Sequence, residues 1–234
     1  MFAFKVSRKK IIPVLKISLI YLFLAPVVVL LIYRVIPVRT SSYIFQQYIS
    51  NIFNGSFSFV HHKWVGWDGI PNNMKMAVIA SEDQIFADHF GFDIESIQKA
   101  LNEKRRKTRG ASTITQQVAR NLFLWGGRSY VRKGLEAYFT LLIEVLWSKE
   151  RILEVYLNIA EFGNNIYGVG AASRIHFKKQ CLKMNTDECA TLAAVLPNPK
   201  KYKASSISPY LRRRVSWIKS QIYQLGGKSY LDRL

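Results

Sequence analysis

The stretch MAVIASEDQIFADHFGFD, residues 76–93, joins an apolar run to two adjacent carboxylates, Glu82 and Asp83. If the run is helical, Glu82 follows Ile79 by three residues and Val78 by four, so it shares a face with apolar side chains. A carboxylate in such surroundings is partly desolvated, which raises its pKa and suits it to act as a general base or acid. The alternative is that Glu82 is the buried partner of an arginine, and this stretch by itself favours neither interpretation.

The pattern around this stretch is mostly helical, and the helical segments are separated by Gly, Pro, Asn or basic turns. The segments that we expect to be helical are residues 72–89, 93–104, 112–125, 131–163, 168–179, 186–199 and 208–227. Alternation typical of strands is scarce, so we expect a mainly α fold. Residues 40–69 show no sustained period and are expected to form a stalk that leads into the domain.

The charge of the chain points to an anionic partner. The 234 residues contain 34 Lys and Arg against 15 Asp and Glu, a net charge of +19 at pH 7. Such an excess is unusual for a soluble enzyme that has no anionic partner. Nucleic acid, anionic lipid and a phosphorylated substrate are the three candidate classes.

The N-terminal segment indicates which of these three classes of partner is favoured. Ile17 to Tyr33 contain no charged residue. The length of this run is near the lower limit for a helix that crosses a bilayer. The basic residues that precede it predict a cytoplasmic N-terminus, although Arg34 and Arg39 oppose this bias; they are Lys5, Arg8, Lys9, Lys10 and Lys16. We expect an uncleaved single-pass anchor in preference to a signal peptide, because no small-residue cleavage site follows. An external domain disfavours nucleic acid and favours lipid phosphate.

These features divide the chain into four parts. We expect a cytoplasmic tail at residues 1–16, a transmembrane anchor at 17–36, a stalk and jaw entry at 37–63, and a catalytic domain at 64–234. The two cysteines, Cys181 and Cys189, are too few for a disulfide framework or a zinc site, and both a local bridge and two free thiols remain open.

The second informative stretch is RGASTITQQVARN, residues 109–121. Thr113 and Gln116 fit a capping box, so a helix should begin here behind a turn of small residues. Exposed backbone N–H groups at the helix start, flanked by Arg109 and Arg120, make a natural phosphate site. The basic segment before it, residues 103–110, is either a solvated turn or a flap over an anionic ligand.

The third stretch, RKGLE, places Arg132 and Lys133 four and three residues before Glu136 on one side of a helix. Surface ion pairing explains this spacing, and it is the preferred explanation for an isolated motif. Two cations beside a carboxylate are equally suited to hold a diphosphate leaving group.

Taken together and in order, these motifs resemble those of the peptidoglycan glycosyltransferases that polymerise lipid II. The first motif comprises Glu82, Asp83, Phe86, His89 and Gly91; the second contains Gly110, Ser112, Thr113, Ile114, Thr115, Gln116 and Gln117; the third contains Arg132, Lys133 and Glu136; and the fourth contains Lys149, Ile152, Tyr156, Leu157, Asn158 and Gly163. The resemblance covers roughly residues 64–227. The chain ends at Leu234 without a transpeptidase domain, so we expect a monofunctional member.

The resemblance implies a lysozyme-like glycosyltransferase domain with a smaller membrane-proximal jaw. It also implies that Glu82 is the general base and that Glu136 is the second catalytic carboxylate. The residues implied to bind substrate or diphosphate are Ser112, Thr113, Gln116, Gln117, Arg120, Asn121, Arg132 and Lys133. Those implied to be structural are Lys149, Tyr156, Asn158 and Gly163. Two departures affect fine geometry: Arg120 stands where many relatives have lysine, and His176 stands where tyrosine is expected.

The partners implied are lipid II, the growing glycan strand, the membrane and other cell-wall synthesis proteins, without nucleic acid. The implied location is the bacterial inner membrane, with the catalytic domain outside. No cofactor is required, but Mg or Mn bound with the diphosphate near Glu136 fits the motif. Two other classes remain as alternatives: a glycan-cleaving lytic transglycosylase or lysozyme, and a non-catalytic membrane-anchored scaffold.

Overall fold

The computed structural model describes residues 20, 23–55, 58–102, 112–127 and 129–234, and the chain divides into two compact units, residues 1–36 and 37–234. In the first unit, residues 23–33 are helical. No helix within the described ranges is both long enough and apolar enough to cross a membrane. The anchor expected at residues 17–36 lies partly outside these ranges and stays a prediction, and the basic segment 103–110 lies outside them entirely.

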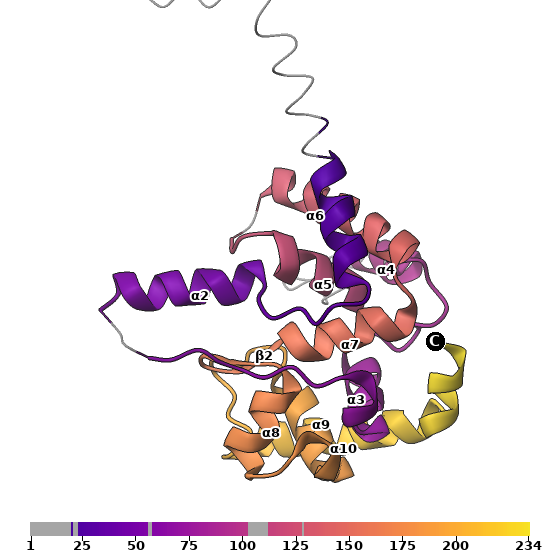
Figure 1. Ribbon diagram of the computed structural model, residues 1–234. Coiled ribbons are helices and arrows are strands. Elements are labelled where there is room, and N and C mark those ends of the chain that lie inside the picture. Colours follow the sequence, from indigo (N-terminus) through magenta and orange to yellow (C-terminus); the bar gives the residue numbers. More distant parts are fainter. Residues whose placement is uncertain (1–19, 21–22, 56–57, 103–111, 128) are drawn as a thin grey trace, which may run out of the picture. The chain divides into compact units, whose positions relative to one another are not determined.

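The second unit is mainly helical, as the sequence predicts (Figure 1). Its helices are α2 (Ser42–Phe53), α3 (Asn72–Glu82), α4 (Ile94–Asn102), α5 (Ile114–Phe123), α6 (Tyr130–Leu146), α7 (Lys149–Ile159), α8 (Val169–Phe177), α9 (Thr186–Val195) and α10 (Pro209–Gln224). Short 3-10 turns are η1 (Trp67–Gly69), η2 (Cys181–Lys183) and η3 (Gly227–Arg233). The strands β1 (His61–His62), β2 (Glu161–Gly163) and β3 (Ile166–Tyr167) form a small sheet in the order β1-β3-β2.

Helix α3 forms the centre of the core. Every residue from Met74 to Ala80 is buried, and the helix packs against α9 and α10. The expectation that this helix continues through Phe86 to His89 is wrong, because α3 ends at Glu82. Asp83 leaves the helical conformation, and its carboxylate is then free to accept a hydrogen bond from the backbone N–H of Ile114, at the start of α5.

The loop after α3 depends on one glycine. Gly91 has φ +79°, in the left-handed region that favours glycine, and a Cβ added there would lie 2.7 Å from Thr140 and 3.0 Å from Glu144. The loop therefore passes close to the C-terminal half of α6, the helix that carries the third motif in its N-terminal half.

Helices α5, α6 and α7 form a second layer in which α5 contacts both of the others. The expectation of one helical run over residues 131–163 is wrong, because the chain forms α6, α7 and β2 there. Trp147 is extended, and the Ser148 side chain caps α7 by accepting from the backbone N–H of Arg151. The apolar pattern continues across this corner because both helices face the same core, and for that reason the pattern does not reveal the break.

The segment expected to be a stalk also contains regular structure. The expectation of no periodic element there is wrong for Ser42–Phe53, which form α2 with Ser41 as N-cap. Gln46 in α2 donates a hydrogen bond of 2.9 Å to the backbone oxygen of Leu124 after α5, so tertiary contact also supports this helix. Farther along, β1 pairs in parallel with β3.

The cysteines are both free and buried. Burial raises the pKa of the Cys181 thiol and of the Cys189 thiol to about 12. Both thiols therefore stay protonated at neutral pH.

Candidate active site

Glu82 is the last residue of α3, and its side chain keeps 15% of its exposure. The burial raises the pKa of its carboxyl above the ordinary value, and the neighbouring Asp83 raises it further. Its position at the helix C-terminus also disfavours negative charge, because the partial charge of the helix dipole is negative there. Glu82 thus has the raised proton affinity expected of a general base at neutral pH.

A chain of two hydrogen bonds fixes one oxygen of this carboxylate. Gln117 on α5 donates to Glu82 Oε2 over 3.1 Å, and the Tyr156 hydroxyl on α7 donates to Gln117 Oε1 over 3.2 Å. Burial raises the pKa of Tyr156 well above its ordinary value, so the hydroxyl keeps the proton that it donates. Tyr156, expected to be structural, therefore belongs to the network of Glu82.

The other oxygen faces a cation. Arg214 Nη2 on α10 lies 3.6 Å from Glu82 Oε1, and both Arg214 and Arg120 oppose the rise in the pKa of Glu82. Glu82 therefore does have an arginine beside it, as the alternative interpretation of the sequence expects. The pair is not a closed salt bridge, however, because 3.6 Å is beyond a hydrogen bond and Glu82 also lines a cavity.

Asp83, the neighbouring carboxylate, is used inside the protein. It is buried, and its Oδ2 lies 2.9 Å from His89 Nε2 and accepts from the backbone N–H of Ile114 over 2.9 Å. An anionic side chain at the first N–H groups of a helix is electrostatically favourable. Asp83 and His89 therefore orient the first motif against α5.

Lys149, which is expected to be structural, stabilises the loop after α3. Its Nζ donates to the backbone oxygen of His89 over 2.6 Å and to Glu144 Oε1 over 2.9 Å, and it lies 4.7 Å from the centre of the buried Phe86 ring. Thr115 of the second motif donates to the same Glu144 oxygen over 2.6 Å. A single buried carboxylate thus connects the first, second and fourth motifs.

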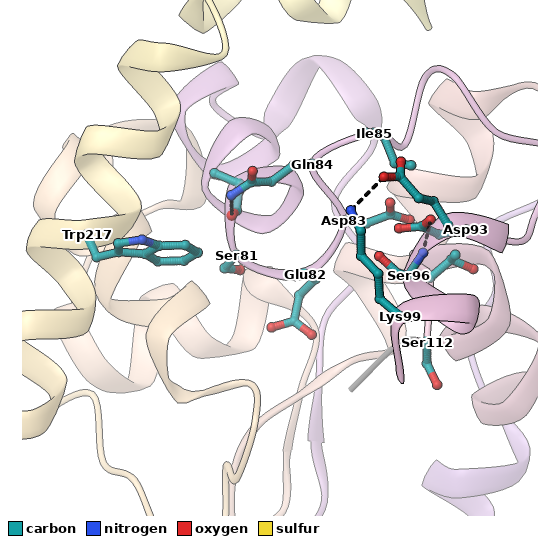
Figure 2. Close-up of a pocket in the computed structure, with 13 residues that line it drawn as sticks. Ser81, Glu82, Asp83, Gln84, Ile85, Asp93, Ser96, Lys99, Ser112 and Trp217 are labelled. Atoms are coloured by element: carbon teal, nitrogen blue, oxygen red, sulfur yellow. Dashed lines mark hydrogen bonds and ion pairs between the residues drawn. The ribbon is translucent and has the colours of Figure 1, made fainter. Parts of the chain in front are cut away.

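A cavity of about 430 Å³ opens beside Glu82. Figure 2 shows the Glu82 carboxylate pointing into the space between Trp217 of α10 on one side and Lys99 and Ser112 on the other. Asp83 and Thr113 also line it. Ser112 and Thr113, at the start of α5, therefore line the cavity, and the predicted capping box of Thr113 and Gln116 is confirmed.

A second cavity, of about 230 Å³, adjoins the other end of the Gln117 and Tyr156 pair. Its walls include Arg120 and Asn121 of α5 and Glu161 of β2. Arg120 Nε and Glu161 Oε1 are buried there, and neither has a hydrogen-bond partner among the described residues. The network of Glu82 is therefore flanked by two cavities with polar walls.

The third motif forms an ion-pair cluster on α6. Glu136 is 2% exposed, and its two oxygens lie 3.1 Å from Arg132 Nη1 and 2.5 Å from Lys133 Nζ. Lys133 remains half exposed. None of the three lines either of the two cavities described above, so the structure does not bring Glu136 and Glu82 together around one of them.

The remaining expected residues have internal positions. Gln116 is buried, and its side-chain oxygen accepts from the Thr113 backbone N–H as part of the cap. Asn158 is fully buried and exchanges hydrogen bonds of 2.7 and 2.8 Å with the backbone of Val65. At Gly163 a Cβ would lie 3.0 Å from Ile166 in the small sheet. These residues support the site from within the fold.

Sequence reasoning missed Arg214, Trp217 and Glu161. A signal was present for Arg214, which lies three residues after Leu211 and four before Ile218 and therefore shares the buried face of α10. A cation on an apolar face needs a partner, and the partner is Glu82.

The described residues do not fit a metal held by the protein alone. They contain no group of three or more His, Cys, Asp or Glu side chains that could hold an ion. Each oxygen of Glu136 is already in contact with a cationic side chain.

Comparison with known proteins adds a family to this geometry. A family model described as Transglycosylase matches residues 42–223. A biosynthetic peptidoglycan transglycosylase of Pseudomonas entomophila is 49% identical over 219 residues, which are 93% of this chain and 93% of that protein. Proteins of the same name from Cronobacter sakazakii and Pseudomonas aeruginosa are 53% and 47% identical, over 86% and 92% of this chain and 85% and 94% of theirs.

Proposed function

Because the chain belongs to the transglycosylase family, we propose that it is a peptidoglycan glycosyltransferase that polymerises lipid II into linear β-1,4-linked glycan strands. The observation that carries this function is the Glu82 carboxylate, which is largely shielded from solvent, lines one cavity and accepts a hydrogen bond from Gln117, a residue that lines a second cavity. Glycan transfer joins two substrates, and a base that is connected to two polar cavities suits that reaction. The mainly helical domain fits a lysozyme-like fold with a smaller jaw.

In the proposed reaction, Glu82 removes the proton from the 4-hydroxyl of the acceptor sugar. The hydroxyl oxygen forms a bond to the anomeric carbon of the donor as the bond from that carbon to the diphosphate oxygen breaks. The attack is in line and inverts the configuration of that carbon. Undecaprenyl diphosphate leaves with the bonding electrons, and the proton ends on Glu82.

Charge then develops on the departing diphosphate, and cationic side chains are suited to stabilise it. We assign this role to Arg120, whose Nε is buried without a partner among the described residues, and to Arg132 and Lys133. Glu136 orients the two α6 cations through its contacts with both. A divalent ion near Glu136 would take most of its ligands from the diphosphate, because the described residues do not form a metal site, and no step here depends on one.

The proposed location is the inner membrane, with one N-terminal anchor and the catalytic domain outside. The uncharged run from Ile17 to Tyr33 and the net charge of +19 support it. Basic residues near an anionic bilayer contribute about 1 kcal/mol each to binding. The basic surface of the protein would also concentrate a substrate that carries a lipid and a diphosphate. Other cell-wall synthesis proteins would lie in the same membrane and are proposed as partners.

The substitution Glu82→Gln tests the reaction. Loss of one general base costs about 10²- to 10⁴-fold, so the purified variant should nearly cease to polymerise labelled lipid II on a gel assay. Glu150→Gln, at an exposed position in the first turn of α7, is the matched control and should keep the wild-type rate. Wild-type polymerisation by the Glu82 variant would show that Glu82 is not the base.

The same proteins separate the alternatives. A lytic transglycosylase or lysozyme would release soluble fragments from purified sacculi, and we expect none. A non-catalytic scaffold would form no polymer from lipid II in any variant, including the wild type.

A further inference from the structure

Arg214 lies on a helix that is held rigidly against the helix of Glu82. α10 begins at a Ser208 N-cap with Pro209 in its first turn, and it packs on α3 and α9. Gln84, just after α3, donates a hydrogen bond of 3.0 Å to Gln221 of α10. The distance between the ends of the two side chains is therefore set by helix packing.

The guanidinium of Arg214 is itself constrained. The side chain is 21% exposed, and its Nε is buried without a hydrogen-bond partner among the described residues. Its central carbon lies 5.9 Å from the ring centre of Trp217, within range of a cation–π contact. Trp217 also lines the Glu82 cavity. The charge of Arg214 is thus held 3.6 Å from Glu82, beside a residue of the cavity wall.

The two carboxylate oxygens of Glu82 differ in their surroundings. Oε2 accepts the hydrogen bond of Gln117, whereas Oε1 lies 3.6 Å from Arg214 Nη2, too far for a hydrogen bond. Oε1 therefore keeps lone pairs that a substrate hydroxyl can reach. A cation at this distance stabilises the charged carboxylate without occupying the oxygen that must take the proton.

We propose that Arg214 is a positioning residue of the polymerisation reaction, one that keeps Glu82 ionised and leaves Oε1 as the oxygen that accepts the proton. The inference rests on the proposed function and deepens it. Burial and the end of α3 both favour the neutral carboxyl, which is inactive as a base, and Arg214 opposes them.

The other charged and titratable groups around Glu82 are accounted for. Asp83 adds a negative charge, Arg120 of α5 adds a positive one, and Tyr156 of α7 stays neutral. On α4, Lys99 and Glu95 line the same cavity but pair with each other at 2.6 Å. Asp93, just before α4, also lines it and adds a negative charge, and its carboxylate accepts a hydrogen bond of 2.8 Å from the backbone N–H of Ser96. The hydrogen bond from Gln117 lowers the pKa of Glu82, and Arg214, whose Nη2 lies 3.6 Å from Glu82 Oε1, lowers it more than Arg120 does.

The test is the pH dependence of kcat/KM for lipid II polymerisation by the full chain. Without the cation the pKa of Glu82 rises, so for Arg214→Gln the acid limb should move to higher pH by about one unit. Arg214→Lys should restore most of the position of the limb. Arg212→Gln, on the exposed side of the same helix, is the matched control and should leave it unchanged.

Two other roles would give different results. If Arg214 only stabilised the fold, Arg214→Gln would lower the rate by one factor at every pH and leave the limb in place. If it only bound substrate, KM would rise while the pH dependence of kcat stayed as in the wild type. Either result overturns the proposal.

A titration without substrate separates this proposal from the function on which it rests. In protein labelled with 13C at glutamate carboxyl groups, the signal that disappears in Glu82→Gln should titrate at higher pH in Arg214→Gln than in the wild type. An unshifted midpoint would overturn the inference even if polymerisation is observed. A shifted midpoint in a wild-type protein that polymerises nothing would overturn the function and, with it, the role of Arg214 in that reaction.

Discussion

Glu82 is a residue at which catalysis and stability have opposite requirements. Because its pKa is raised in the folded protein by burial, ionised Glu82 disfavours the fold. The sign follows from linkage: below the ordinary carboxyl pKa there is no penalty, and stability is lost as the pH rises through the pKa of the folded state. A tenfold difference in proton affinity corresponds to about 1.4 kcal/mol.

We therefore expect Glu82→Gln, the variant that should lose polymerisation, to be more stable than the wild type at pH 7. The gain should shrink as the pH is lowered toward 4, where the wild-type carboxyl is also neutral. Thermal unfolding of both proteins across this range measures it. A gain that is the same at every pH would mean that the amide improves packing and that ionisation of Glu82 costs nothing.

At the scale of elements, the start of α5 differs from the start of α9 because it also forms a wall of the Glu82 cavity. Thr113 caps α5 in a capping box, and Asn185 caps α9 in an equivalent box with Glu188. Thr113 lines the cavity, and its hydroxyl also donates to the backbone oxygen of Gly91 over 2.7 Å. The two caps thus share one local structure but differ in what lies beside them.

Thr113→Ala and Asn185→Ala should each lower the free energy of unfolding by about 1 kcal/mol, because each removes an N-cap. Only Thr113→Ala should also slow polymerisation of lipid II, since it loosens Ser112, which lines the cavity. Chemical unfolding and the polymerisation rate of both variants check this. Equal loss of activity in both would contradict a special role for the start of α5.

The elements also show what the sequence could and could not predict. The local sequence predicts the capping box of Thr113, because the two residues that form the box are only three positions apart. The end of α3 at Glu82 was missed, because Asp83 leaves the helix to bond Ile114, thirty-one positions away. The corner at Trp147 was missed because the apolar period continues through it, and α2 was missed because contact with the segment after α5 supports it.

The candidate site likewise contains some features that the local sequence predicts and others that depend on the packing of distant elements. Glu82 was predicted from its apolar neighbours on α3 and from the ordered motifs, all of which lie in short stretches of sequence. The contact with Arg214 spans more than half the chain and depends on how α10 packs on α3, which no local pattern records. Tyr156 likewise gained its place beside Glu82 through Gln117, by packing of α7 on α5.

At the scale of the whole molecule, the proposed membrane location has a counterpart on α2. This helix carries no charged residue and exposes apolar side chains at a helical spacing along one face. They are Phe45, Tyr48, Ile49, Ile52 and Phe53. Only five residues, Pro37 to Ser41, separate α2 from the segment expected to be the anchor. An apolar helix face with aromatic side chains suits the interface of a bilayer.

If α2 lies in the interface, the double substitution Ile52→Asp with Phe53→Asp should slow polymerisation of lipid II embedded in bilayer vesicles by about tenfold or more, because each apolar side chain contributes about 1.5–3 kcal/mol when fully buried. The two residues are 72% and 84% exposed within the protein, so the fold should tolerate the change. Tyr223→Asp, at an 86% exposed position on α10, is the control and should leave the rate on vesicles unchanged.

A second substrate separates membrane contact from catalysis. The wild type, the double variant and Tyr223→Asp should all polymerise a water-soluble lipid II analogue with a short chain at the same rate. Equal rates on vesicles would mean that α2 does not contact the bilayer, whereas a loss on the soluble analogue as well would place the defect in catalysis.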